Sequence, residues 1–153
     1  MSKSAFVIAC LLFLGLLVGI VPAQAAEPAD VIGHIKKLDG SVKILRGGKE
    51  IDAKLGDDVY MNDALKSGPG AAMGVTFKDN TRIAIGPETE FVIDNFVFQP
   101  QKNKLSFGSH ITKGTLQVIS GTIAKLAPQS VKFDTPTGTI GVRGTRFLVK
   151  VEN

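Results

Sequence analysis

The sequence predicts an all-β fold: one sandwich-like or roll-like domain of short, mostly antiparallel strands. Turn signals built from Gly, Pro, Asp and Asn recur about every 8–12 residues after residue 30, a spacing typical of β sandwiches and barrels. Short runs rich in Val, Ile, Phe and Thr lie between these turns. No stretch after residue 30 shows a convincing 3.6-residue apolar period, so the pattern does not indicate helices.

The first half of the chain predicts two hairpins. Residues 31–36 and 41–45 flank Asp39-Gly40, a dipeptide typical of tight hairpin turns. Residues 72–77 and 81–85 flank a second polar turn, and in the latter strand Ile83 and Ile85 share one face with Arg82 and Ala84 on the other. Turns at residues 46–49 and 67–70 and a short strand at residues 58–61 fill the interval.

The second half predicts a long strand at residues 90–98 and an exposed polar loop at residues 99–104. Further short strands are expected at residues 105–107, 115–119, 122–126, 131–133 and 145–151. In the last of these, Phe147, Val149 and Val151 alternate with Arg146, Leu148 and Lys150, so one face is apolar.

The N-terminus has the order of a secretory signal peptide. Lys3 precedes the apolar run of residues 5–21, and Ala23-Gln24-Ala25 fits the small-x-small cleavage pattern. We expect residues 1–25 to be removed after Ala25, leaving a β domain over residues 26–153. The protein would then be periplasmic or secreted.

Two alternatives for this segment fit the sequence less well. An uncleaved anchor needs about 20 apolar residues, and this run is shorter and ends in a cleavage site. A lipoprotein signal at Cys10 would need its apolar run before the cysteine, whereas here most of the run follows it. We therefore expect no stable membrane anchor. Because Cys10 is the only cysteine, the mature chain would have no disulfide and no thiolate.

Charge is unevenly distributed along the chain. Residues 27–98 carry nine Lys or Arg against twelve Asp or Glu, whereas residues 99–153 carry eight against two. A basic region of this kind attracts anionic partners, or is an ordinary solvated surface. Nucleic acid is not expected as a partner, because the chain is predicted to be exported, contains no Trp and has no Lys/Arg run longer than two.

The sequence predicts neither an enzyme nor a metal site nor a cofactor. Ser109 and His110 are adjacent, so one strand would place them on opposite faces, and the segment lacks a nucleophile elbow. A hydrolase using His110 remains an alternative. Two isolated histidines make a poor zinc site. Residues 56–58 and 79–81 offer oxygen ligands for calcium without EF-hand spacing, and we interpret them as turns.

A glycine-rich segment near the C-terminus is the most distinctive motif. Gly138, Gly141 and Gly144 follow a G-x-x-G-x-x-G spacing, which is neither the dinucleotide fingerprint nor a phosphate loop. Residues 135–138 predict a turn in which proline fixes one φ and Gly138 permits a positive φ. Gly141 and Gly144 would allow another backbone to approach closely.

Arg143 lies between two of these glycines and has two possible roles. It could bond several backbone carbonyls or a carboxylate within the fold, which is a structural role, or be displayed to the carboxylate of a partner. The first role predicts that Arg143→Ala destabilises the fold, by roughly 1–3 kcal/mol where the bonding partners of the guanidinium are buried.

Residues 133–149, FDTPTGTIGVRGTRFLV, closely resemble the closing signature of the FecR domain, in which a Thr-Pro turn leads to an Arg-Gly-Thr step and a last strand. Residues 33–93 also follow the order of that family, with a Gly-Asp step at residues 56–59, a Ser-Gly turn at 67–68 and a Pro corner at 87–89. The Arg143-Gly144-Thr145 step is the most specific part of the resemblance.

The resemblance implies a non-enzymatic β domain of the cell envelope. The namesake members are regulators with a cytoplasmic anti-sigma segment, one transmembrane helix and a periplasmic β domain that receives a signal from an outer-membrane transporter. In this chain we expect no cytoplasmic segment, so it would not pass a signal across the inner membrane by itself. Other proteins with the domain are exported, and some are linked to cell-wall or surface-polymer binding.

We therefore expect a protein-interaction or signalling module whose partner is an envelope protein, either periplasmic or in the outer membrane. The alternative is a module that binds peptidoglycan or an anionic polysaccharide, although Tyr60 is the only Tyr available for stacking on sugars. The candidate binding residues are Thr139, Arg143, Gly144 and Thr145. The candidate structural motif consists of Asp134, Thr135, Pro136, Gly138 and Gly141.

Overall fold

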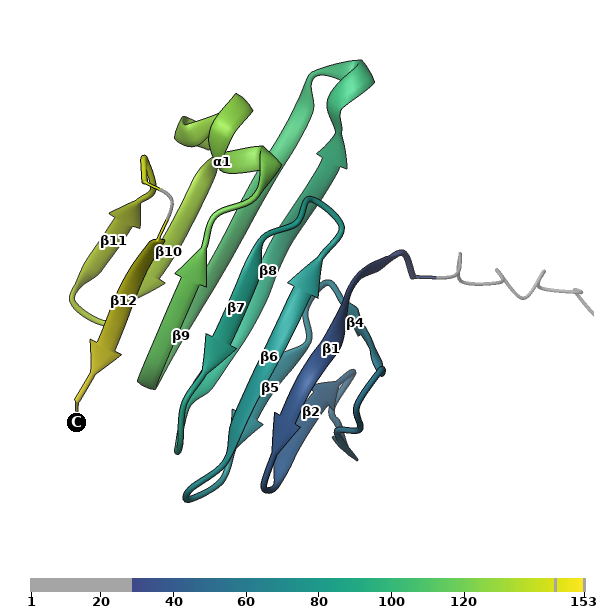
Figure 1. Ribbon diagram of the computed structural model, residues 1–153, viewed down its shortest axis with the longest axis vertical. Coiled ribbons are helices and arrows are strands. Elements are labelled where there is room, and N and C mark those ends of the chain that lie inside the picture. Colours follow the sequence, from purple (N-terminus) through teal and green to yellow (C-terminus); the bar gives the residue numbers. More distant parts are fainter. Residues whose placement is uncertain (1–28, 145, 153) are drawn as a thin grey trace, which may run out of the picture.

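A computed structural model describes residues 29–144 and 146–152, and it confirms the predicted all-β class (Figure 1). Within these residues twelve strands are accompanied by one short α-helix and two 3₁₀ turns. The strands are β1 (Val31–Asp39), β2 (Val42–Arg46), β3 (Lys49–Asp52), β4 (Asp58–Tyr60), β5 (Ala64–Ser67), β6 (Ala72–Phe77), β7 (Arg82–Ile85), β8 (Glu90–Gln99), β9 (Lys104–Ile119), β10 (Val131–Thr135), β11 (Gly138–Gly141) and β12 (Arg146–Val151). The helical segments are η1 (Pro100–Lys102), α1 (Thr122–Leu126) and η2 (Pro128–Ser130). No helix of the described residues is long and apolar enough to cross a membrane.

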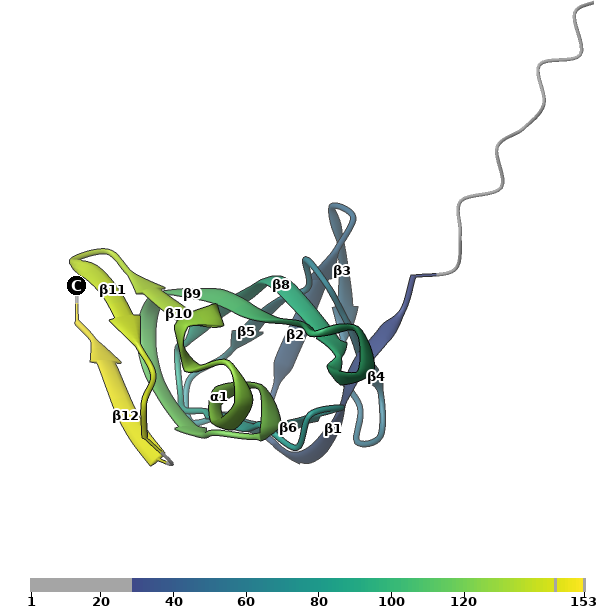
Figure 2. The same ribbon diagram turned by 90° about the horizontal axis from the view of Figure 1, so that it is seen from above.

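The sheet curls into two layers because the long strand β9 belongs to both of them (Figure 2). Its first part pairs with β8 and, in parallel, with β10, and its last part pairs with β7 and β12. Gly114 lies at the change of layer with φ +97°. A Cβ atom there would lie 2.2 Å from the Thr89 hydroxyl oxygen, so only glycine fits this bend.

The core lies between the two layers and is dominated by Phe, Ile and Val. A chain of aromatic contacts crosses it, with ring centroids 5.0 Å apart for Phe77 and Phe107, 5.5 Å for Phe107 and Phe133, and 5.2 Å for Phe133 and Phe147. These distances are typical of favourable aromatic pairs. The chain links the first strands to the C-terminal strands, so β10 and β12 are packed on the same core as β6.

Several predicted elements are confirmed. β6 and β7 form the expected antiparallel hairpin, with Ile83 and Ile85 buried and Arg82 and Ala84 exposed. β12 shows the expected alternation, since Val149 is buried and Leu148 is exposed. Residues 99–104 are exposed around η1. These segments obey the period-2 rule because each has one face on the core and one in solvent.

The hairpin expected at Asp39-Gly40 is wrong. Gly40 has the left-handed φ of +71° that such a turn needs, but β1 pairs with β4 and β6 whereas β2 pairs with β3 and β5. The turn therefore carries the chain from one layer to the other. The residues of a turn determine how sharply the chain bends, whereas the arrangement of the whole sheet determines which strands then pair.

The strand expected at residues 122–126 is also wrong, because this segment forms α1 toward one end of the molecule (Figure 1). The β6–β7 turn anchors it: the backbone N–H of Ile123 donates to the carboxylate of the buried Asp79 at 3.2 Å, and that of Thr122 to its carbonyl at 2.7 Å. Ile123 is fully buried beneath it. Tertiary contacts override the β propensity of Thr and Ile here.

Other strands also differ from the prediction in their number and bounds. The short strands expected at residues 105–107 and 115–119 are parts of the single 16-residue strand β9. β3, β5 and β11 were not predicted as strands. β5 begins next to Asp63, which is fully buried and accepts two hydrogen bonds of 2.8 Å from Arg46. This bond raises the pKa of Arg46 and ties β2 to the start of β5.

Candidate functional site

The edges of the curled sheet differ in how well they are protected against pairing with another chain. Edge strands β3, β4, β11 and β12 are each hydrogen-bonded to a neighbouring strand on one side in the described residues. β3 carries Lys49, Glu50 and Asp52, and β4 has three residues, so both have features that discourage edge pairing. β11 reads Gly-Thr-Ile-Gly and carries no charge. β12 carries the exposed charges of Arg146 and Lys150. β11 is therefore the least protected edge of the four.

The β10–β11 hairpin that presents this edge is held by its own threonine. The Thr135 hydroxyl oxygen accepts hydrogen bonds from the N–H groups of Thr137 (3.3 Å) and Gly138 (3.1 Å) and donates to the Gly138 carbonyl at 2.8 Å. The predicted turn at residues 135–138 is thus confirmed, with Pro136 exposed at its tip. The positive φ expected at Gly138 is wrong, because the threonine side chain closes the turn instead.

A polar pair lies across the hairpin next to this turn. Asp134 and Thr139 are cross-strand partners, and the Thr139 hydroxyl donates a hydrogen bond to the Asp134 carboxylate. Both residues are exposed. The pair fixes the register of β11 on the solvent side, while Phe133 packs into the core on the other.

The glycines of the motif do not make the close backbone contacts that we expected. A Cβ atom built at Gly138, Gly141 or Gly144 would have no other described residue within 4 Å. The close approaches occur instead at Gly114 and Gly121, which the sequence motif does not include. The motif glycines therefore leave open space along the edge, which an incoming backbone could occupy.

Arg143 follows β11 and is exposed. The hydrogen bonds and ion pairs among described residues include none from its guanidinium, so the expected bonding to carbonyls or a carboxylate of the fold is not found there. It borders a hollow of about 320 Å³ lined by Pro128, Gln129, Gly141 and Val142. Val142 is buried, which anchors this short connection next to the exposed arginine. Thr145, the last residue of the Arg-Gly-Thr step, lies outside the described residues.

β12 lies beside the hairpin without pairing to β11 (Figures 1 and 2). A groove of about 390 Å³ runs between residues 135–140 of the hairpin and residues 149–152, which are the end of β12 and the residue after it. At its rim the hydrogen bond between Lys150 and Glu152 raises the pKa of the lysine and lowers that of the glutamate. On the outer face of β12, Leu148 is 67% exposed. The sequence analysis did not predict this surface residue as a binding residue, although its place between Arg146 and Lys150 in the alternation is a signal that it faces solvent.

The catalytic candidates do not meet. Ser109 is fully buried and its hydroxyl has no hydrogen-bond partner among the described residues, whereas His110 points to the other face of β9. There Nδ1 of His110 lies 2.8 Å from the Asp94 carboxylate. A carboxylate next to a histidine orients the ring. Ser109, the catalytic candidate that precedes His110, lies on the opposite face of β9 and is not reached by this pair.

The oxygen-rich turns have structural roles. The carboxylate of Asp79 accepts hydrogen bonds from the N–H and hydroxyl of Thr81, at 3.0 and 2.7 Å, in addition to the bond to α1. The Asp57 carboxylate accepts from the Lys54 N–H at 2.8 Å. In the part of the chain that the structure describes, no three His, Cys, Asp or Glu side chains cluster as metal ligands would.

One comparison with known proteins bears out the resemblance seen in the sequence. A family model described as FecR protein matches residues 63–153, which is more than half of the chain. No curated protein matches the chain. Among solved structures, one described as a cell surface anchoring domain is 34% identical with a TM-score of 0.39; the match covers 40% of this chain and 82% of that one.

Proposed function

Because the chain belongs to the FecR protein family, we propose that it is a non-enzymatic interaction module of the cell envelope with a role in signalling. It binds an extended segment of a partner protein along the edge formed by β11. The observation that carries this proposal is an uncharged edge strand, bordered by open space at its glycines and by an exposed arginine. Such an edge offers its backbone groups for strand addition.

The proposed contacts divide into backbone pairing and side-chain selection. Main-chain hydrogen bonds to the free side of β11 supply affinity without reading the partner's sequence. Thr139, Arg143, Gly144 and Thr145 make the contacts, and Arg143 selects a carboxylate through its planar guanidinium. Asp134, Thr135, Pro136, Gly138 and Gly141 form the framework that presents them, with the Thr135 hydrogen bonds keeping the hairpin closed.

The proposed compartment is the periplasm or the exterior, reached by cleavage after Ala25. The predicted signal peptide and the start of the 26–153 domain lie outside the described residues, so this part rests on the sequence. Intact-mass and N-terminal analysis of protein from the envelope fraction tests it, and we expect the mature chain to begin at Ala26. A product that retains residues 1–25 and stays with the membrane would contradict it.

Site-specific photo-cross-linking in intact cells tests the proposed edge. A photoreactive residue replaces Thr139 in one variant and Ile51, on the charged edge β3, in a control. Both positions are exposed, so the two probes differ in place rather than in accessibility. We expect a discrete protein adduct from position 139. Adducts of equal yield from position 51, or none from a folded protein probed at 139, would rule the edge out.

A further inference from the structure

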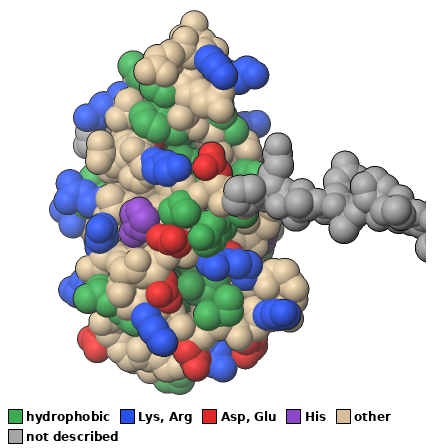
Figure 3. All heavy atoms as spheres, turned by 90° about the vertical axis from the view of Figure 1, so that its right-hand side faces the viewer, with side chains coloured by type: hydrophobic (Ala, Val, Ile, Leu, Met, Phe, Trp, Pro, Cys, Tyr) green, Lys and Arg blue, Asp and Glu red, His purple; other side chains and the backbone are tan. Residues whose placement is uncertain are grey.

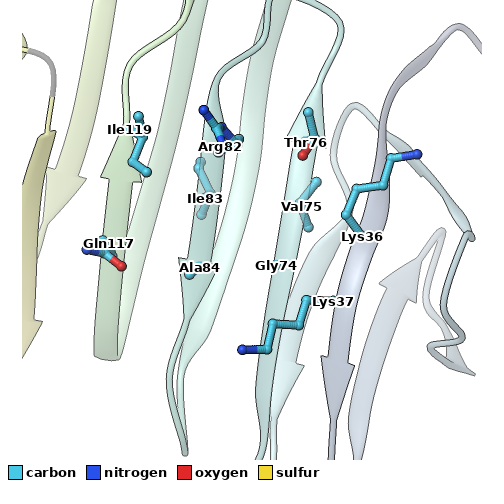
Figure 4. A pocket seen from close by; sticks show the side chains of 10 residues that line it. All are labelled: Lys36, Lys37, Gly74, Val75, Thr76, Arg82, Ile83, Ala84, Gln117 and Ile119. Atoms are coloured by element: carbon cyan, nitrogen blue, oxygen red, sulfur yellow. The ribbon is translucent and has the colours of Figure 1, made fainter.

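A shallow trough lies on the outer face of the layer that contains β1, β6 and β7, and it takes no part in the proposed edge interaction (Figure 4). It has a volume of about 190 Å³ and lies over β1, β6, β7 and the end of β9. Its polar lining includes Lys37, Arg82 and Gln117, and its floor is formed by Gly74 and Ala84. In Figure 4, Lys37 extends across Gly74 toward β7. Lys36, at the register shift in β1, also lines the trough.

The strand register explains both the floor and the walls. Lys37, Gly74, Ala84 and Gln117 are successive cross-strand partners, so a glycine and an alanine fill the middle of one row. The next row on the same face consists of Thr76, Arg82, Ile119 and Arg146. Two small side chains beside a row with two arginines leave a trough bordered by positive charge.

The cations of this trough are available to a ligand. Lys37, Arg82 and Arg146 are exposed, and the ion pairs among described residues include none of them. When the amide oxygen of Gln117 faces Arg146, it accepts hydrogen bonds from the Arg146 guanidinium at 2.6 and 2.9 Å. These bonds hold the arginine side chain over the sheet.

The acidic groups nearest these rows are engaged or peripheral. Asp58 lies 2.8 Å from His34, which is the cross-strand partner of Thr76. Glu152 pairs with Lys150, and Asp39 lies at the end of β1. By contrast, the β1 and β4 side in Figure 3 mixes basic and acidic side chains. The trough therefore presents a field of one sign, assembled from residues in both halves of the chain.

We propose that this cationic trough, defined by Lys37, Gly74, Arg82, Ala84, Gln117 and Arg146, binds a carboxylate-bearing polysaccharide. Beneath its floor, β6, β7 and the end of β9 are each paired on both sides, so recognition over these strands falls to side chains. Arginine forks match carboxylates, and Thr76 and Gln117 offer groups that hydrogen-bond sugar hydroxyls.

A membrane surface fits the trough less well. Interfacial binding needs a set of apolar side chains that enter the lipid, and in these two rows and their extension to β12 the large apolar residues are Ile119 and Leu148. The inference is independent of the proposed edge at β11, because the two surfaces share no residue.

Titration with polygalacturonate at low salt tests the proposal. The double variant Lys37→Gln/Arg82→Gln removes two charges from the trough, and Lys49→Gln/Lys102→Gln removes two exposed charges from β3 and η1 at the same net charge. We expect the trough variant to lose about tenfold or more in affinity, the control to lose about twofold or less, and wild-type binding to weaken as salt rises. Both variants should keep the wild-type melting temperature.

The proposal would be overturned by no binding of polygalacturonate to the wild type, by an equal loss in both double variants, or by equal binding of polyglutamate. Binding of anionic phospholipid vesicles in place of the polysaccharide would also overturn it and indicate a membrane surface. Cross-linking from position 139 should be unchanged in the trough variant. Loss of polymer binding with that adduct intact separates this site from the edge.

Discussion

At the scale of single residues, the glycines that attract attention in the sequence are not those that the fold requires. Gly138, Gly141 and Gly144 stand out by their regular spacing, yet each has room for a side chain. Gly114 and Gly121 sit in unremarkable sequence, yet the backbone or a side chain of a neighbouring segment occupies the place of their Cβ atoms. Sequence spacing does not reveal close approach, because the approaching atoms come from distant residues.

This difference predicts opposite results for two alanine substitutions. A Cβ atom at Gly121 would lie 2.3 Å from the Thr81 nitrogen, so Gly121→Ala must displace the β6–β7 turn or α1 and should cost about 3 kcal/mol. Gly141→Ala meets no atom and should change the free energy of unfolding by no more than about 0.5 kcal/mol. Urea unfolding of both variants measures this. Equal destabilisation would mean that the motif glycines are structurally constrained after all.

Arg143 gives a second prediction at this scale. Because its side chain is exposed, we expect Arg143→Ala to leave the melting temperature unchanged and to weaken partner binding. This replaces the 1–3 kcal/mol loss expected from the structural role. Thermal unfolding together with the yield of the adduct from position 139 distinguishes the two. A lower melting temperature with an unchanged adduct would restore the structural role.

At the scale of elements, α1 depends on a contact that its own five residues do not encode. Asp79→Ala removes the acceptor for Ile123 and Thr81 from a fully buried position and should cost about 2–4 kcal/mol. Asp57→Ala, which removes one hydrogen bond at an exposed turn, is the matched control and should cost about 1 kcal/mol or less. Chemical denaturation compares them, and equal costs would contradict the anchoring role of Asp79.

Some strands and turns could be predicted from the sequence, and others could not. The β6–β7 hairpin and β12 were predicted because each alternates between the core and solvent. The Asp39-Gly40 hairpin failed because a turn dipeptide does not specify which layer receives the next strand. At the candidate site, the turn at residues 135–138 was predictable from Thr and Pro. The open edge of β11 was not, because it depends on which strands pair elsewhere.

At the scale of the whole molecule, one core holds the two layers together through the contacts of Phe107 with Phe77, Phe96 and Phe133. Phe107 is 1% exposed, so Phe107→Ala should cost about 3–5 kcal/mol, a large share of the stability of a typical domain. Phe98→Ala, at a partly buried position beside the core, should cost clearly less. Denaturant midpoints test this, and similar midpoints would show that the aromatic chain does not join the layers.

The positive charge of the folded surface is distributed differently from the charge along the chain. Counting along the chain placed positive charge in residues 99–153, whereas the fold gathers Lys37 and Arg82 with Arg146 on one face. The uncharged edge and the cationic trough lie on different parts of the sheet, so each can be altered without the other. The central claim is that the β11 edge receives a partner strand.

The most direct test is cross-linking from position 139 in intact cells that carry either Gly141→Lys or the control Ile51→Lys. A Cβ atom at position 141 has open space around it, and a lysine there places a charge on the edge, as natural edge strands do to prevent pairing. The predicted result is a discrete adduct that Gly141→Lys abolishes and Ile51→Lys preserves, with both variants folded. An adduct that survives Gly141→Lys at full yield would contradict strand addition at β11.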